Sequence, residues 1–581
     1  MGQSIGEQLA FLYGAEAAPA LAAKLESVLN RFQMEHPELA TGEGTDSRFD
    51  KLKTSRFSEK DAILITYGDM VQTPDAPPLA ALGDFLKQWL GDVVSTVHLL
   101  PFFPYSSDDG FSVIDYRAVN PALGGWGDVD QIGQHFRLMF DVVANHISAQ
   151  SEWFQAFLRD EAPYRDYFTV IEGDPDLTAV FRPRSLPLLT AVSTPSGTKK
   201  VWTTFSADQI DLNYANPDLL FEILDILLLY IAHGAAFIRL DAIAFIWKEI
   251  GTDCLHRPQT HAIIKLMRTA LNIAAPQVSI ISETNVPHKD NVSYFGNGRD
   301  EAQMVYNFSL PPLTLHAFHT GNAETLSRWA KTLTLPSDEV TFFNFLASHD
   351  GIGLTPTDGI LDKTAVNQMA ARVEALGGYV SYKSNGDGSK NAYELNINYL
   401  DALGNPDNPD EPIKTVADRF LAAQAIMLAL RGVPGIYFHS LFGSKGWREG
   451  AEENGRSRTI NREKLPLTDL EAELSDKQSL RYAIYSGYAN LLRNRAQQPA
   501  FHPNSDQEIL DIHDAVFAVR RTAVNDGSSI LCLQNVSSQP VTVTLSATQP
   551  LRNILDGRVY AGENGRLRLE LRPYGVCWLA V

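Results

Sequence analysis

Hydrophobic runs of eight to eleven residues recur along most of the chain and are separated mainly by amphipathic stretches. Each run is rich in Val, Ile, Leu and Phe, which indicates a strand buried on both faces, as in a parallel sheet. The stretches between them, such as residues 260–273 and 417–430, have helical spacing. Strands that alternate with helices in this way predict a (β/α)₈ barrel of the α/β class, whose chemistry lies at the carboxyl ends of the strands. The eight candidate strands are residues 62–69, 94–102, 138–146, 236–244, 278–285, 304–312, 340–350 and 432–440.

Two long insertions interrupt this alternation, after the third and the seventh strand. Long loops on the upper face of a barrel usually shape a substrate site. The first sixty residues are charged and predict a helical extension, whereas residues 541–545 and 567–571 alternate with period two and predict a C-terminal antiparallel β domain. The expected division is 1–60 (helical extension), 61–500 (barrel, with insertions at 147–214 and 351–411) and 501–581 (β domain).

The overall composition predicts a globular protein with a substantial core, since 44% of the residues are hydrophobic and 20% charged. A formal net charge of −20, with no basic block, argues against a nucleic-acid partner. The three cysteines, Cys254, Cys532 and Cys577, are widely scattered. That pattern favours a reducing compartment and indicates neither a disulfide framework nor a zinc site. No cluster of metal ligands is visible in the sequence, and oligomeric state is left open.

Neither a secretion signal nor a membrane span is expected. The N-terminus has no basic region, and Glu7 and Glu16 interrupt its apolar residues. The most apolar segment, residues 219–232, is too short to cross a bilayer and follows a helix start at Asn216. We therefore expect a cytoplasmic protein without membrane contact.

Ionisable residues collect where the candidate strands end, and Arg239 and Asp241 are the most informative pair. They are two positions apart in the run FIRLDAIAF, so they point to the same side of one strand. The neighbouring guanidinium is expected to keep Asp241 ionised, as a carboxylate nucleophile requires. Taken alone, such a pair is more often a structural ion pair that caps a strand. Other polar residues at strand ends are Asp141, Asn145, His146, Glu283, His349 and Asp350, with Asp108 and Phe111 after the second strand.

Asp241 and Glu283 lie on consecutive strands, which places their carboxyl groups at a predicted separation of roughly 5 Å. Retaining glycosidases need this spacing for a nucleophile and an acid/base, whereas inverting enzymes need a wider gap. No basic residue stands within four positions of Glu283, which suits a carboxyl that holds a proton. Asp350 is placed to stabilise a positively charged transition state.

Four motifs, DVVANH, FIRLDAIAF, ISETN and ASHDG, resemble in order and spacing the signature regions of the α-amylase superfamily, glycoside hydrolase family 13. The resemblance covers roughly residues 60–581. It implies that Asp241 is the nucleophile, Glu283 the acid/base and Asp350 the transition-state stabiliser. It further implies a glucosyl subsite lined by Asp141, His146, Arg239 and His349.

Within that family the chain is most similar to the sucrose-phosphorylase group, through segments such as LLPFFPYSSDDGFSVIDY, FRPRSLPLLT and SRTINR. This resemblance implies that Arg184 binds phosphate and that Arg458 lies near the glucosyl subsite. It also implies that Asp108 binds sugar hydroxyls and that Phe111 forms a wall of the site. Inorganic phosphate would be a co-substrate, with no cofactor and no metal.

The expected acceptor side departs from the sucrose-specific pattern. The chain has Phe245, Asn285 and Glu394 where sucrose phosphorylases tend to have Tyr, His and Gln. The N-terminal extension and the segment NAYELNINYL look more like glucosylglycerate phosphorylases, whose acceptor is an acid. Lys383 is a candidate partner for that acid, although a lysine in a loop is more often simply solvated.

The preferred interpretation is a retaining α-glucoside phosphorylase that acts on glucosylglycerate, with small-molecule sugar and phosphate as its partners. Sucrose phosphorylase is one alternative, and a retaining α-glucosidase or transglucosidase is another. A noncatalytic sugar-binding relative is a third. Incubation with glucosylglycerate or sucrose, each with and without phosphate, distinguishes them.

Overall fold

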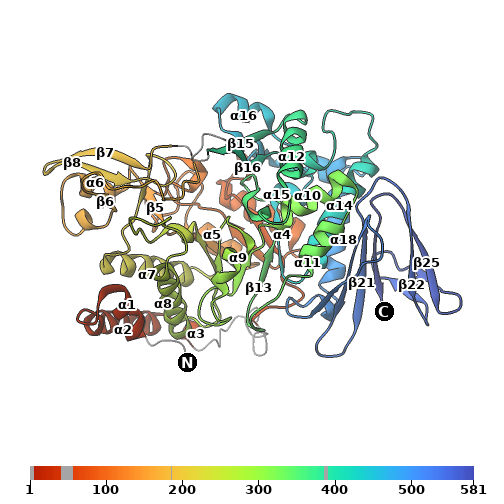
Figure 1. The fold of residues 1–581 in the computed structure, drawn as a ribbon, viewed down its shortest axis with the longest axis horizontal. Helices are drawn as coiled ribbons and strands as arrows, with labels where there is room; N and C mark the ends of the chain where they lie inside the picture. The colour runs from red at the N-terminus through yellow and green to blue at the C-terminus, as the bar shows by residue number, and fades with distance from the viewer. Residues whose placement is uncertain (1–4, 41–55, 185, 385–389) are drawn as a thin grey trace.

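A computed structural model describes residues 5–40, 56–184, 186–384 and 390–581 of the chain (Figure 1). At its centre, eight parallel strands close into a barrel in the order β1-β17-β13-β12-β11-β10-β4-β3. Each of the eight hydrophobic runs matches one of these strands to within one residue at its start or contains it, so the predicted (β/α)₈ barrel is confirmed. The strands are β1 (Ile63–Thr66), β3 (Thr96–Leu99), β4 (Arg137–Val143), β10 (Ala235–Asp241), β11 (Ser279–Ser282), β12 (Met304–Tyr306), β13 (Thr341–Asn344) and β17 (Val433–Tyr437).

Helices follow the strands in the alternation that parallel pairing requires. α7 begins where the sequence indicates, because the Asn216 side chain accepts a hydrogen bond from the Asp218 amide and Pro217 occupies the first turn. Its ten buried side chains explain why this segment is apolar on nearly every face. The barrel helices are α4 (Pro78–Leu90), α5 (Trp126–Gly133), α7 (Pro217–Ala232), α8 (Pro258–Ala274), α9 (His288–Asn291), α10 (Leu310–Thr320), α11 (Glu324–Ala330), α14 (Ile413–Ala429) and α18 (Leu480–Arg495).

Two insertions rise from the carboxyl ends of the barrel strands. The first lies between β4 and β10 and contains two small antiparallel sheets, β5-β9 and β6-β8-β7. Its elements are β5 (His146–Ser148), α6 (Glu152–Leu158), β6 (Val170–Ile171), β7 (Leu189–Thr194), β8 (Gly197–Trp202) and β9 (Gln209–Asp211).

The second insertion lies between β13 and β17 and is built on the sheet β14-β16-β15. Its elements are β14 (Ile352–Gly353), α12 (Lys363–Ala375), β15 (Tyr379–Ser384), β16 (Lys390–Asn396) and α13 (Tyr399–Leu403). After β17 the chain forms α15 (Phe438–Leu441), α16 (Arg448–Asn454), the 3₁₀ turn η7 (Ser457–Asn461), β18 (Leu465–Pro466) and α17 (Leu467–Ser475), and β18 pairs with β2 (Val71–Gln72).

The N-terminal helices α1 (Ile5–Tyr13), α2 (Ala18–Glu35) and α3 (Pro37–Ala40) pack beside α7 and α8 (Figure 1). Lys24 Nζ lies 2.7 Å from Asp218 Oδ1, and the Tyr13 hydroxyl donates to the Tyr214 carbonyl. These contacts attach the described part of the extension to the outside of the barrel.

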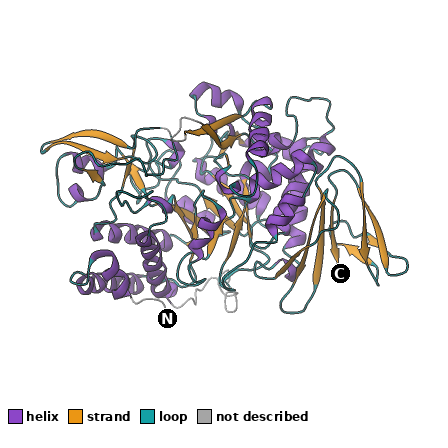
Figure 2. Ribbon diagram, viewed as in Figure 1, coloured by secondary structure: helices purple, strands orange, loops and turns teal. Residues whose placement is uncertain are grey.

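The C-terminal region is antiparallel, as its period-two pattern predicts, and Figure 2 shows its strands apart from the barrel. β22 and β25 alternate between buried and exposed residues, and their buried side chains pack on the larger sheet. Arg495, buried on α18, donates to carbonyls of Glu59, Gly432 and Phe501 and so ties this region to the barrel. The strands are β19 (Asp506–Ile509), β20 (Val516–Thr522), β21 (Ser529–Asn535), β22 (Val541–Ser546), β23 (Leu551–Asn553), β24 (Val559–Tyr560), β25 (Arg566–Leu571) and β26 (Val576–Ala580).

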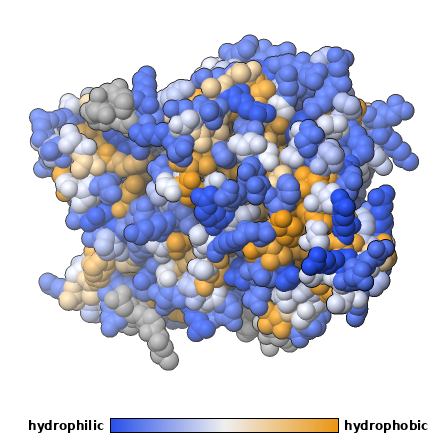
Figure 3. Space-filling view, turned by 45° about the vertical axis from the view of Figure 1, so that its right-hand side comes forward, coloured by the Kyte–Doolittle hydropathy of each residue, from blue (hydrophilic) through white to orange (hydrophobic). Residues whose placement is uncertain are grey.

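Hydrophilic side chains cover most of the face drawn in Figure 3, with smaller hydrophobic patches between them. Among the described helices, none combines the length and the apolar composition that a bilayer crossing demands.

Candidate active site

A cavity of about 720 Å³ opens at the carboxyl ends of the barrel strands, beneath both insertions. Its walls contain most of the site residues predicted from the sequence, but not Asp141 and Arg239, which are buried, nor Lys383. The residues that line it include Asp108, Phe111, His146, Arg184, Asp241, Phe245, Glu283, Asn285, His349, Asp350, Glu394 and Arg458.

Arg239 is the centre of a buried ion-pair network that spans four strands. Its Nη1 donates to Asp241 Oδ1 at 2.8 Å and to Asp141, which stands opposite Arg239 in the register of β10 and β4. Its Nη2 lies 3.8 Å from Glu283 Oε2, and His98 on β3 bonds the other oxygen of Asp141 at 2.6 Å. The simple strand-end pair expected from the sequence is therefore one edge of a larger network.

The two carboxyls on neighbouring strands are placed side by side. β10 and β11 pair in parallel, with Leu240 opposite Ser282. Asp241 and Glu283 are the next residues along each segment, so they stand at the same level. Glu283 Oε2 also accepts the amide of Ala242, the residue after Asp241, at 3.1 Å.

The expectation that Arg239 simply keeps Asp241 ionised needs correction. Burial raises the pKa of Asp241 well above its usual range, against the lowering effect of Arg239, and burial likewise raises the pKa of Glu283. Two adjacent buried carboxyls titrate as a pair and share a proton before both ionise. Because Arg239 bonds Asp241 directly and lies 3.8 Å from Glu283, the guanidinium favours the ionised form of Asp241 more strongly than that of Glu283.

Asp350, beyond the end of β13, is held ionised. Burial alone would raise its pKa, but Arg458, His349 and Arg462 lower it far below the usual range. Arg458 Nη1 lies 2.6 Å from Asp350 Oδ1, and Arg462 Nη2 lies 3.3 Å from the same oxygen. The site thus contains a proton-holding pair on one side and a fixed carboxylate on the other.

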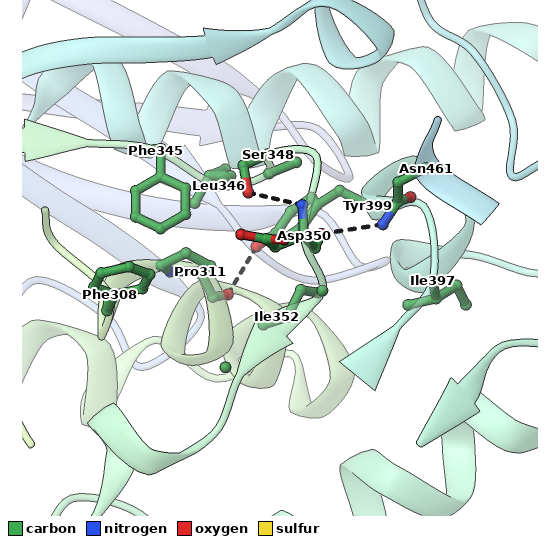
Figure 4. Close-up of a pocket in the computed structure, with 13 residues that line it drawn as sticks. Phe308, Pro311, Phe345, Leu346, Ser348, Asp350, Ile352, Ile397, Tyr399 and Asn461 are labelled. Atoms are coloured by element: carbon green, nitrogen blue, oxygen red, sulfur yellow. Dashed lines mark hydrogen bonds between the residues drawn. The ribbon is translucent and has the colours of Figure 1, made fainter. Parts of the chain in front are cut away.

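The backbone of Asp350 is fixed as firmly as its side chain (Figure 4). Its amide donates to Ser348 Oγ at 3.1 Å, and its carbonyl accepts from Asn461 Nδ2 at 3.2 Å. Behind it, Tyr399 donates to the carbonyl of Pro311 at 2.9 Å, which joins the second insertion to α10. The other side chains of this wall are mainly hydrophobic.

The loop after β3 presents two consecutive acidic residues in left-handed backbone, Asp108 at φ 53° and Asp109 at φ 49°. Such geometry is unfavourable for residues other than Gly and persists where surrounding contacts impose it. Here Arg462 Nη1 bonds Asp109 at 2.5 Å, and Arg184 from the first insertion lies 3.3 Å from Asp108.

Aromatic and imidazole rings form the wall between these groups. Phe111 stacks on His349 with 4.8 Å between ring centroids and 3° between ring planes. His146 Nε2 lies 2.9 Å from the Phe111 carbonyl. Burial lowers the pKa of His146 and lowers that of His349 to about 3, so both imidazoles are neutral at pH 7 and suited to hydrogen bonding with hydroxyls.

The three residues expected to contact the acceptor have different surroundings in the structure. Glu394 is already held by Arg458, at 2.8 Å and 3.3 Å, so its first role is to orient that arginine. Asn285 has a buried Oδ1 without a hydrogen-bond partner among the described residues. Its amide packs against Gly353, where an added Cβ would lie 2.6 Å away. Phe245 forms part of the cavity wall.

Sequence reasoning missed Arg456 and Arg462, which line the cavity, and Lys248, which does not line it but holds polar residues near the strand ends. Arg462 belongs to the same SRTINR segment as Arg458, so that signal was present but was used for one arginine only. Lys248 bonds Asp211 at 2.7 Å and Asn145 at 2.8 Å. Its partners come from separate segments, and nothing in the local sequence indicates the contact.

Known proteins with similar sequence or structure agree with this geometry. A family model described as alpha amylase, catalytic domain, matches residues 84–355. A glucosylglycerate phosphorylase of Allomeiothermus silvanus is 48% identical, over 99% of this chain and 98% of that protein. A sucrose phosphorylase of Agrobacterium vitis is 30% identical, over 76% of this chain and 88% of that protein. The crystal structure of a sucrose 6F-phosphate phosphorylase from Thermoanaerobacter thermosaccharolyticum has a TM-score of 0.72 at 25% identity, covering 86% of this chain and 97% of that one.

Three observations lead to one assignment. They are the barrel, the neighbouring carboxyls at the ends of β10 and β11, and the sequence identity to the first of these relatives over nearly its full length. The chain belongs to glycoside hydrolase family 13, the α-amylase family, in the branch that contains the glucosylglycerate and sucrose phosphorylases.

Proposed function

We propose that the protein is a retaining α-glucoside phosphorylase that converts glucosylglycerate and phosphate reversibly into α-D-glucose 1-phosphate and glycerate. The observation that carries the choice of substrate is the 48% identity to a glucosylglycerate phosphorylase over 99% of the chain, against 30% over 76% for a sucrose phosphorylase. The acidic pair at the ends of β10 and β11 supports a retaining mechanism.

In the first half-reaction Asp241 attacks the anomeric carbon while Glu283 gives its proton to the departing glycerate oxygen. The bond from glucose to glycerate breaks and a bond to Asp241 forms, which inverts the anomeric centre. In the second half-reaction a phosphate oxygen attacks that carbon, Asp241 departs, and the phosphate proton passes to Glu283. Two inversions return the α configuration.

The shared proton of the buried pair suits this sequence of steps. Glu283 begins protonated, as an acid must, and Asp241 begins ionised, because Arg239 bonds it directly. Asp350, held ionised by Arg458, stabilises the positive charge that develops on the sugar ring. The other residues proposed to hold the glucosyl ring are Asp108, Phe111, Asp141, His146, Arg239, His349 and Arg458.

Phosphate is the co-substrate, and Arg184 is the group proposed to bind it. A guanidinium presents a planar fork of donors that matches phosphate oxygens. In the structure Arg184 is a third exposed, lies 3.3 Å from Asp108 and covers the Phe205 ring at 5.7 Å. A single contact of this length is readily exchanged for a dianion that accepts two hydrogen bonds.

The test of the function is to incubate the protein with glucosylglycerate and with sucrose, each with and without phosphate. We expect α-D-glucose 1-phosphate to form from glucosylglycerate only when phosphate is present. Free glucose released at the same rate with or without phosphate would favour the α-glucosidase or transglucosidase alternative. Faster phosphorolysis of sucrose than of glucosylglycerate would favour the sucrose phosphorylase alternative.

Replacing Arg184 with Ala is expected to lower kcat/KM for phosphate about 10- to 100-fold, since a hydrogen bond to a charged group contributes about 1.5–3 kcal/mol. Hydrolysis of the same donor, which needs no phosphate, should fall much less. The matched control is Arg182→Ala, which removes an exposed arginine two residues away that bonds the Leu186 carbonyl and does not line the cavity. Equal losses of phosphorolysis and hydrolysis in R184A would contradict the assignment.

A further inference from the structure

The proposed acceptor carries a carboxylate, and the cavity that receives it is already rich in acidic groups. Most cations around the cavity have carboxylate partners within 4 Å. They are Arg184 with Asp108, Arg239 with Asp141, Asp241 and Glu283, Arg458 with Asp350 and Glu394, and Arg462 with Asp108, Asp109 and Asp350. A carboxylate brought in by the substrate needs a cation that these pairs do not occupy.

Two cations form no ion pair within 4 Å in the part of the chain that the structure describes: Arg456, which lines the cavity, and Lys383, which adjoins lining residues. They have different neighbours. Arg456 lines the cavity beside Arg458. It is close enough to Tyr105 to lower the pKa of that phenol, which burial and Asp109 raise. Arg456 therefore belongs to the side formed by the loop after β3, which holds Asp108.

Lys383 lies on the other side, where the acceptor residues are. Its Nζ lies 4.8 Å from the ring centroid of Phe181, and the Phe181 ring lies 6.2 Å from that of Phe245. Both phenylalanines line the cavity, and Phe245 follows Asp241 by four residues.

The strand that carries Lys383 also borders the cavity. On β15, Ser381 stands opposite Glu394 of β16 and Lys383 opposite Asn391. Ser381, Tyr382 and Glu394 line the cavity, so Lys383 follows directly on two lining residues. Lys383 also lowers the pKa of Asp358, which burial raises, so that acid is near Lys383, although the two form no ion pair within 4 Å.

We infer that Lys383 binds the carboxylate of the acceptor and thereby selects an acidic three-carbon acceptor over a neutral one, an assignment that rests on the proposed function. A lysine above an aromatic ring is partly shielded from water but keeps ammonium hydrogens free for a carboxylate. Asn285, with its unpartnered Oδ1, is the group that accepts a hydroxyl hydrogen of the same acceptor.

The experiment runs the reaction in the synthetic direction, with α-D-glucose 1-phosphate as donor and either D-glycerate or glycerol as acceptor. The two acceptors differ in that glycerol has a hydroxymethyl group in place of the carboxylate. Lys383→Met keeps the chain length and its contact with Phe181 but removes the charge. We expect K383M to lower kcat/KM for D-glycerate at least about tenfold, which corresponds to about 1.4 kcal/mol, and to change that for glycerol less than about twofold.

Arg456→Met is the matched control, because it removes the other unpaired cation of the cavity. We expect the ratio of D-glycerate to glycerol to stay within about twofold of wild type in R456M and in the charge-preserving variant K383R. Lys383→Gln, a second neutral variant, repeats the measurement if K383M does not fold.

Two failures are distinguishable. If the wild-type protein makes no glucosylglycerate from D-glycerate, the proposed function is wrong whatever Lys383 does. If the wild type uses D-glycerate and K383M or K383Q keeps its ratio of D-glycerate to glycerol, the role of Lys383 is overturned. An equal loss with both acceptors would also overturn it, because the effect would then be independent of the carboxylate.

Discussion

Replacing Asp241 with Asn is expected to abolish turnover of every donor, with a loss of kcat of at least about 10⁴-fold, because removal of a nucleophile leaves only binding and the remaining catalytic groups. The substitution changes one oxygen to nitrogen and keeps the contact with Arg239 available on the other oxygen. The measurement is phosphorolysis of glucosylglycerate, together with intact-protein mass in the presence of donor. Wild type should gain one glucosyl unit when phosphate and acceptor are withheld, and D241N should gain none.

A second buried acid provides the control for D241N. Asp401 is 5% exposed, accepts the Gly446 amide at 2.7 Å and has a pKa raised to about 6 by burial, but it does not line the cavity. Asp401→Asn should leave kcat within a few-fold of wild type. Residual activity of D241N above a few per cent would remove Asp241 from its proposed role as nucleophile.

Replacing Arg239 with Met should destabilise the fold by about 3–5 kcal/mol at pH 7, since it leaves buried carboxylates without their partner. Asp141 is fully buried, Asp241 nearly so, and both bond this guanidinium. The free energy of unfolding from urea titration measures the effect. The control is a more exposed ion pair, Arg257 with Glu249 at 2.6 Å. Arg257→Met should lower the free energy of unfolding by less than about 1 kcal/mol.

The decrease in the free energy of unfolding caused by R239M should become smaller as the pH is lowered from 7 towards 4. Burial raises the pKa of Asp241 and Glu283 in the folded protein, so their contribution to stability is full below the unfolded pKa and is lost as pH rises. Arg239 lowers both pKa values and so limits this decrease in stability as the pH rises. Without Arg239, the decrease in stability at pH 7 is larger. A destabilisation that stayed constant from pH 7 to 4 would mean that Arg239 contributes through packing instead of charge.

Much of the barrel was predictable because its signal is local. Every barrel strand overlaps a hydrophobic run visible in the sequence, and the polar residues that end those runs had to meet at one rim once the strands were parallel. The start of α7 at Asn216 and the alternation of β22 and β25 were predictable for the same reason. Each depends on spacing within a few consecutive residues.

The electrostatic state of the site was not predictable from spacing. Glu283 has no basic neighbour in sequence, yet Arg239 lies 3.8 Å from it across the strand pair. Glu394, expected to contact the acceptor, is held by Arg458 from a segment sixty-four residues away. Burial, which raises the pKa of Asp241 despite Arg239, depends on everything packed around the site.

The sequence by itself therefore determined the barrel, the order of its strands along the chain and many of the acids and bases that reach the rim, because periodicity and strand alternation are local properties. The tertiary structure alone decided which charges pair, which carboxyls are buried together and which cations have no carboxylate partner among the described residues. Those outcomes depend on distances between segments far apart in the chain and on the exclusion of water from the space between them.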